Sequence, residues 1–362
     1  MTESYHIAVI GGGAAGIAAA VTAARAGGKT LLLDKNPAVG GTGGLSGLTT
    51  LCGLFDDAGN FLNPGFPREF ADAIAETAPV KMGRVWVLPY RPEKFRAVAE
   101  KFLAELPNLQ LCRKTPLNQV VSAADRIVSL NGFKIGAVID CSGDAEVARA
   151  VGAACLETDE STQASAVIFE LQNVTRDLQT PADAAQILLP VARAGFPPVN
   201  FITNPESPSV TAKFSGEPEQ VPQLIEFLRA NISGFENAAA AQPAFAQTRR
   251  AGRMIIGEYV LTGADVLAGA RFSDAVARCA WPIEQWSVAG GAKYRYLPAG
   301  AHYEIPARSL RAAQIKNLFM AGKTISADVD AIASARVMGG CLATGAATGK
   351  LAMDYLNSTH QK

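Results

Sequence analysis

The start of the chain carries two short apolar runs on either side of a segment that is rich in alanine. The runs, at 7–10 and 30–33, are almost free of polar positions, which is typical of strands buried on both faces of a parallel sheet. Between them, residues 14–26 are mostly alanine, the strongest helix former. This pattern predicts a strand, a helix and a second, parallel strand, which together make one βαβ unit.

The turn after the first strand holds three glycines in the spacing G-x-G-x-x-G. The first permits a tight turn, the second lets a pyrophosphate approach the backbone, and the third lets the helix pack closely on the strand. The amides at the start of the helix attract the pyrophosphate, and an acid that ends the second strand accepts hydrogen bonds from a ribose diol. We expect these dinucleotide contacts at Gly11, Gly13, Ala14, Ala15, Gly16, Asp34 and Lys35.

The apolar spacing changes character twice along the rest of the chain. Helical spacing and short apolar strands continue to about residue 155, at 69–76, 92–105, 109–130, 135–141 and 145–150. Prolines then cluster and the strand signals become mixed, with strands expected at 162–171 and 210–214 and a helix at 221–232. A strand at 317–322 and a last helix of small residues from 338 resemble the first part again.

These changes predict a protein of the α/β class with an insertion. We expect a Rossmann-like nucleotide-binding domain whose first part covers 1–155 and whose return segment, with the C-terminal helix, covers 305–362. An inserted, mixed α+β substrate domain would cover 156–304. Apolar residues make up 49% of the 362 positions, which is enough for the cores of two such domains.

Charge and cysteine usage exclude several classes of partner. The 33 basic and 33 acidic residues balance and form no long basic run, so we expect no binding to nucleic acid. No apolar stretch reaches membrane-spanning length, and the first apolar run is too short for a signal peptide. The six cysteines are scattered without metal-ligand spacing, so we expect a reduced, cytoplasmic protein with no metal centre.

Three separated segments together resemble the FAD-dependent oxidoreductases of the glutathione-reductase-like superfamily. They are the glycine turn with Asp34, the segment VIDCSGD at 138–144, and the pair NLFMAGK at 317–323 and RVMGGCLATG at 336–345. The likeness is to the branch with a single dinucleotide-binding domain and no redox disulfide. It implies FAD as cofactor and a Rossmann-like FAD-binding domain that combines a parallel sheet with a β-meander.

The resemblance also implies further contacts with FAD. The last helix would direct its free amides and the positive end of its dipole toward the reduced flavin. Acids that follow the strand at 317–322 would lie near the ribityl chain. The contacts implied in this way are Gly41, Thr42, Gly143, Asp144, Gly322, Asp328, Asp330, Arg336, Gly339, Gly340 and Cys341.

Two features of that superfamily are missing from the sequence. Disulfide reductases carry a redox cysteine pair after Gly-Gly-Thr, but here residues 40–42 are followed by Gly-Gly-Leu-Ser. A second G-x-G-x-x-G after a strand, which would indicate a separate NAD(P)H domain, does not occur either. We therefore expect the flavin to be reduced by the substrate itself, by a carrier protein or by a quinone.

Hydride transfer to flavin N5 needs an oriented substrate and a base for the accompanying proton. We expect His302 with Tyr303 to supply this base, because histidine titrates near neutrality. Arg249 would bind a substrate carboxylate, and the alternative for its arginine cluster is an ion pair within the protein. The aromatic residues that either line the substrate site or serve only the fold are Trp281, Trp286, Tyr294 and Tyr296.

The sequence leaves three functional classes open. The first is an FAD-dependent oxidoreductase that acts on a small or peptide-borne substrate and passes electrons to an acceptor partner. The second is an FAD-dependent monooxygenase that uses NAD(P)H without a second Rossmann domain. The third is a flavin-binding maturation or assembly subunit with little turnover. No motif decides the substrate, the attachment of the flavin or the formation of a homo-oligomer.

Overall fold

The central sheet of the protein is mainly parallel. Our computed structural model describes residues 3–159, 161, 163–176, 178, 181–203, 209–241, 247–287 and 291–360. The strand order is β6-β2-β1-β9-β8-β7, and β21 also pairs with β9. The parallel strands are β6 (Leu109–Cys112), β2 (Thr30–Leu33), β1 (Ser4–Ile10), β9 (Phe133–Asp140) and β21 (Leu318–Met320). β7 (Val120–Ala123) and β8 (Arg126–Leu130) form an antiparallel meander with β9, which confirms the predicted fold class.

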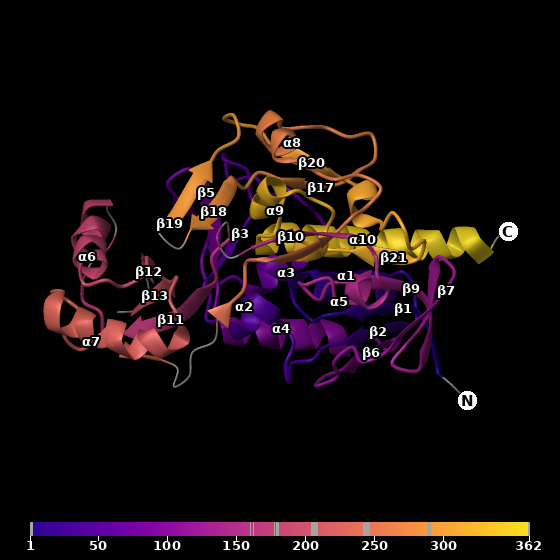
Figure 1. Cartoon of the computed structure of the whole chain (residues 1–362), viewed down its shortest axis with the longest axis horizontal. Helices are drawn as coiled ribbons and strands as arrows, with labels where there is room; N and C mark the ends of the chain where they lie inside the picture. Colours follow the sequence, from indigo (N-terminus) through magenta and orange to yellow (C-terminus); the bar gives the residue numbers. More distant parts are fainter. Residues whose placement is uncertain are drawn as a thin grey trace.

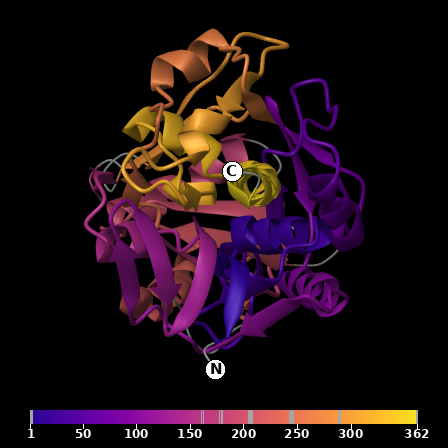
Figure 2. The ribbon, with the colours of Figure 1, turned by 90° about the vertical axis from the view of Figure 1, so that its right-hand side faces the viewer.

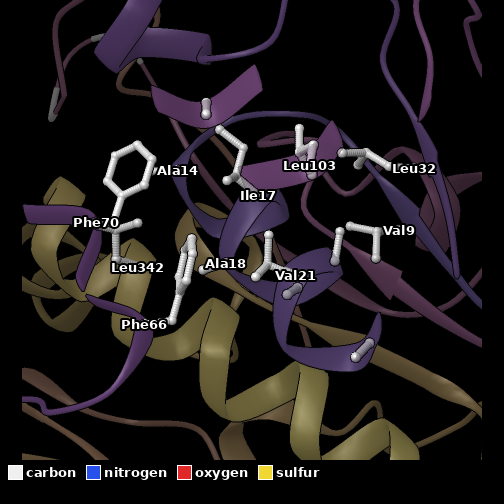
Figure 3. Packing of buried hydrophobic residues seen from close by; sticks show 14 of the residues in the cluster. Val9, Ala14, Ile17, Ala18, Val21, Leu32, Phe66, Phe70, Leu103 and Leu342 are labelled. Atoms are coloured by element: carbon white, nitrogen blue, oxygen red, sulfur yellow. The ribbon is translucent and has the colours of Figure 1, made fainter. Parts of the chain in front are cut away.

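Two helices of small residues pack together beside this sheet. α1 (Ala14–Arg25) lies along α10 (Met338–His360), and glycines of α10 permit their close approach. A Cβ atom on Gly345 would lie 2.2 Å from the carbonyl oxygen of Ala15, and one on Gly349 would lie 2.5 Å from that of Ala19. Apolar side chains of α3 (Phe66–Ile74) and α4 (Pro92–Ala104) complete the core, and Figure 3 shows those of α3 beside α1.

A smaller sheet with its own helices lies at one end of the molecule (Figure 1). It has the order β12-β13-β11-β14, with β15 also paired to β11. Apolar side chains such as Phe169 and Phe214 alternate along its strands and are buried with helices α6 and α7, so the opposite face is turned toward the rest of the protein. Residue 162, where we expected the first strand to begin, lies outside the described residues. The elements are β11 (Ala166–Gln172), α6 (Pro181–Arg193), β12 (Val199–Thr203), β13 (Ser209–Phe214), α7 (Val221–Asn231), β14 (Ala239–Ala240) and β15 (Gln247–Thr248).

Short sheets and helices make up the rest of the molecule. Some lie between the two parts in Figure 1, and others form the orange layer at the top of Figures 1 and 2. Three of them are two-stranded pairs, β10–β16, β17–β20 and β18–β19, and β3-β5-β4 is a three-stranded sheet. Among the described residues, no helix has both the length and the apolar content to cross a membrane. These elements are α2 (Gly41–Leu45), β3 (Thr50–Cys52), β4 (Val80–Met82), β5 (Val85–Pro89), α5 (Glu146–Ala150), β10 (Cys155–Thr158), β16 (Gly252–Ile255), α8 (Gly263–Ala268), β17 (Ala275–Cys279), β18 (Ile283–Ser287), β19 (Gly291–Arg295), β20 (Tyr303–Pro306) and α9 (Val329–Ala335).

Candidate active site

A long cavity runs along the carboxyl ends of the parallel strands. It begins beside Asp34 at the end of β2, passes the turn between β1 and α1, and reaches Cys341 near the start of α10. Its volume is about 470 Å³. In open α/β sheets this edge is where nucleotides bind, because loops and helix N-termini converge there.

The three glycines of the turn serve different purposes. A Cβ atom on Gly11, which has φ +101°, would lie 2.5 Å from the carbonyl oxygen of Cys141, and one on Gly16 would lie 1.7 Å from that of Gly11. Both glycines are therefore required for the strand and the helix to pack. A Cβ atom on Gly13 would meet nothing nearer than the Cα of Gly41, at 3.9 Å. The absence of a side chain at Gly13 thus leaves space in the cavity and not in the protein core.

Asp34 lies at the end of the cavity that is nearer to β2, next to the glycine turn. Its Oδ2 accepts a hydrogen bond from the Gly12 amide at 2.9 Å, and its Oδ1 accepts one from the Asn36 amide at 2.9 Å. Each carboxylate oxygen can accept more than one bond, so the fixed side chain can still receive a hydroxyl. Lys35 forms an ion pair of 2.7 Å with Glu146 on the other side of the cavity.

Arg336 lines the other end of the cavity, at the C-terminus of α9. Its Nη2 donates to Gln163 Oε1 at 3.0 Å. Its Nε is buried and has no acceptor among the described residues. A buried donor without a partner costs about 1–3 kcal/mol. An oxygen atom of a ligand in the cavity would remove that cost.

A second cavity, of about 920 Å³, adjoins the first. Thr50, Cys52, Lys213 and Glu284 line both cavities and form the wall between them. We call these four residues the shared wall. The aromatic side chains around the second cavity are Tyr90, Phe201, Trp281, Trp286, Tyr294 and Tyr296.

Glu284 is held firmly in the shared wall. Its two oxygens accept hydrogen bonds from the indole Nε1 atoms of Trp281, at 2.8 Å, and of Trp286, at 2.6 Å. Burial alone would raise the pKa of Glu284, but the charges of Lys213 and Arg336 and the two indole bonds bring that pKa below its usual value. The site therefore contains a fixed, ionised carboxylate at neutral pH.

The sequence matches the family described as FAD dependent oxidoreductase over residues 6–202 and 199–360. The chain belongs to this family. Its cofactor is therefore FAD. The first cavity fits FAD in two respects, since Gly13 leaves room for a diphosphate beside the start of a helix and Arg336 offers an unused buried donor.

Solved structures share the fold of this FAD-dependent oxidoreductase at low identity. A geranylgeranyl bacteriochlorophyll reductase-like protein from Thermoplasma acidophilum is 13% identical with a TM-score of 0.54, over 99% of this chain and 80% of that one. GidA from Aquifex aeolicus is 14% identical with a TM-score of 0.56, over 98% of this chain and 64% of that one. A comparison with curated proteins found no match.

The structure places most of the expected FAD contacts around the first cavity, together with Arg249. Gly16, Asp328, Asp330, Gly339 and Gly340 do not line it. Those that line it are Gly11, Gly13, Ala14, Ala15, Asp34, Lys35, Gly41, Thr42, Gly143, Asp144, Gly322, Arg336 and Cys341.

The acids and the paired glycines near the last helix have structural contacts instead. Asp328 caps α9 by accepting from the Ala331 amide at 2.7 Å, and Asp330 pairs with Arg295 at 2.5 Å. A Cβ atom on Gly339 would lie 2.3 Å from the carbonyl carbon of Gly53, and one on Gly340 would lie 2.4 Å from the carbonyl oxygen of Ala335. These glycines therefore permit close packing at the start of α10.

His302 and Tyr303 line neither of the two cavities. Tyr303 is fully buried, with its hydroxyl 2.8 Å from the Ser334 hydroxyl. Burial and the nearby charges of Arg271 and Arg278 lower the pKa of His302. The structure thus does not bring this pair to the first cavity, where Lys213 and Glu284 of the shared wall are among the ionisable groups that also line the second cavity.

Sequence reasoning missed the shared wall. Glu284 lies between the two tryptophans that were considered as a wall of the substrate site, and this W-x-x-E-x-W spacing was the available signal. Lys213 lies on a strand where polar and apolar residues alternate, which is equally typical of an exposed face. Neither residue belongs to a motif.

We expect Lys323 to make FAD binding depend on pH. Burial lowers the pKa of its ammonium to about 8, although the Nζ atom donates to the Ala251 carbonyl at 2.8 Å. Lys323 lines the first cavity beside Gly143. A diphosphate bound in that cavity would therefore favour the charged form of the lysine. Above about pH 8 binding then requires uptake of a proton, and we expect FAD affinity to fall roughly tenfold by about pH 9.

Flavin fluorescence titrations of the apoprotein at several pH values above and below about pH 8 would measure the change in FAD affinity. Lys323→Arg, which stays charged throughout, should show a flat profile. Because the lowered lysine pKa makes the folded apoprotein more stable as pH rises from about 8, unfolding would not mimic the effect. Equal profiles for the two proteins would contradict the assignment.

Proposed function

We propose that this FAD-dependent oxidoreductase belongs to the single-dinucleotide-domain branch of the glutathione-reductase-like superfamily and oxidises an organic substrate held in the second cavity. When bound, FAD supplies a hydride acceptor at flavin N5 and a carrier that passes electrons to an external acceptor. The observation that carries the proposal is the shared wall, because a ligand in one cavity would lie next to a ligand in the other.

Glu284 is the proposed proton acceptor. Oxidation of a C–H bond next to a hydroxyl or an amine releases a proton together with the hydride, and a carboxylate at the reacting atom can take that proton. Glu284 is ionised at neutral pH, and the indoles of Trp281 and Trp286 hold it in one orientation. Oε1 also accepts a long bond of 3.5 Å from the Tyr294 hydroxyl, whereas Oε2 accepts the Trp281 bond and keeps a lone pair for the proton.

Residues 156–304 are proposed as the substrate domain. Within this range, β13 carries Lys213 and the hairpin β18–β19 carries Glu284, Trp286 and Tyr294. The opposite side of the second cavity comes from β3, β4 and β5 of the first part of the chain. A substrate would therefore be enclosed between the two parts, away from bulk water.

Release and identification of the bound cofactor, followed by anaerobic mixing with reductants, tests the proposal. The purified protein should be yellow and contain one FAD per chain. Organic donors from a panel of hydroxy acids, amino acids and amines should bleach the flavin band without NAD(P)H. Bleaching by NADPH with oxygen uptake would favour the monooxygenase class instead, and a protein that takes up no FAD would exclude both.

A further inference from the structure

We propose that the second cavity takes a substrate with a flat, apolar body and one anionic group, and that Lys213 binds the anionic group. Calling this ligand a substrate rests on the proposed function. The preference for this type of ligand rests on the cavity alone, whose mouth and inner end differ in character.

The mouth of the second cavity exposes large apolar side chains. Val80, Met82, Tyr294 and Tyr296 are 39–42% exposed and all line this cavity. They make up half of the eight exposed large hydrophobic residues in the described part of the chain. The rings of Tyr294 and Tyr296 stack with centroids 6.1 Å apart. Apolar surface gathered at the opening of a cavity indicates a ligand that covers it, and stacked rings favour a flat one.

Lys213 lies at the inner end, and the carboxylate of Glu284 acts on its charge only at longer range than an ion pair. On β13 it lies opposite Ile168 and Asn200, on the face turned away from α6 and α7. Its ammonium has no hydrogen bond, and no acid within 4 Å, among the residues that the structure describes. A half-buried ammonium in a cavity wall is stabilised when an anion binds beside it.

The remaining charges of the second cavity also favour an anion. Among the described residues that line it, the acids are Glu76 and Glu284, and the cations besides Lys213 are Lys81, Arg91 and Arg176. Glu76 forms an ion pair with Arg91 at 3.5 Å. Glu284 already accepts two indole bonds and is close to the charge of Arg336. The described lining side chains therefore carry more positive than negative charge, which disfavours an amine and favours a carboxylate or a phenolate.

Three probes of the same shape test the inference on the holoenzyme: 2-naphthoate, neutral 2-naphthamide and the cation 2-naphthylmethylammonium. Equilibrium dialysis gives their affinities, and the flavin difference spectrum reports binding next to the cofactor. We expect naphthoate to bind at least about tenfold more tightly than naphthamide, as hydrogen bonds to charged groups imply. Lys213→Met should abolish this ratio and leave naphthamide binding within about twofold.

Lys350→Met, on the exposed side of α10, is the matched control and should preserve the ratio. Equal binding of naphthoate and naphthamide, or a preference for the cation, would overturn the inference while FAD content and bleaching still support the proposed function. The opposite outcome separates the two proposals as well. Naphthoate that binds through Lys213 without changing the flavin spectrum would contradict the proposed function and leave the charge preference intact.

Discussion

Gly13→Val is expected to yield a folded protein that retains no FAD. The backbone of Gly13, with φ −76° and ψ −174°, is one that valine adopts readily, and the nearest atom to its added Cβ is 3.9 Å away. The valine methyl groups would therefore extend into the cavity where we place the diphosphate. We expect the Kd for FAD to rise by at least about two orders of magnitude, which corresponds to about 2.7 kcal/mol.

Two further variants make this result interpretable. Gly16→Val puts a Cβ atom 1.7 Å from the Gly11 carbonyl oxygen and should give insoluble or unfolded protein. Ala26→Val adds the same methyl groups at the exposed C-terminal cap of α1 and should retain FAD. Far-UV circular dichroism would establish folding, and flavin absorbance after gel filtration would establish retention. A yellow Gly13→Val protein with normal FAD content would show that the diphosphate does not lie against the glycine turn.

Glu284→Gln is expected to slow flavin reduction by substrate about 100- to 1,000-fold while FAD content stays normal. The amide keeps the size of the carboxylate but cannot accept the substrate proton, and general bases contribute factors of this order. The change also leaves Lys213 and Arg336 without a nearby negative charge. An anionic ligand should therefore bind more tightly as the rate falls, which a loss of folding would not produce.

Anaerobic stopped-flow reduction measures this rate. Glu219→Gln removes a carboxylate from the exposed surface and serves as the control. In the unmodified protein the lowered pKa keeps Glu284 ionised, so the rate should fall only as the pH drops below the ordinary carboxyl value, about 4.3. If Glu284→Gln reduces the flavin at the normal rate, another group accepts the proton.

The fold and much of the lining of the first cavity could be predicted because their signals are local. Gly11, Gly13 and Gly16 act within one turn, and the strands around them are short apolar runs that are contiguous in sequence. Parallel strands then bring their carboxyl ends to one edge of the sheet, which places Asp34 and Gly322 along a single cavity.

The rest of the candidate site could not be predicted because the same residue types serve several purposes. Asp328 and Gly339 match the pattern of cofactor contacts, but a helix cap and a close backbone crossing need the same two residue types. Histidine is the usual base near neutral pH, yet His302 lines neither cavity. Lys213 and Glu284 are brought to the same wall only by tertiary packing, and no residue spacing in the sequence indicates that they are close.

The packing of α1 against α10 determines when the first βαβ unit can be fully buried during synthesis. One side of α1 is covered by residues near 345, so the alanine face of the first βαβ unit stays open until almost all of the described chain has left the ribosome. The first cavity takes its walls from both helices. A nascent chain therefore carries the glycine turn early but acquires an FAD site only after the segment near residue 345 has been synthesised.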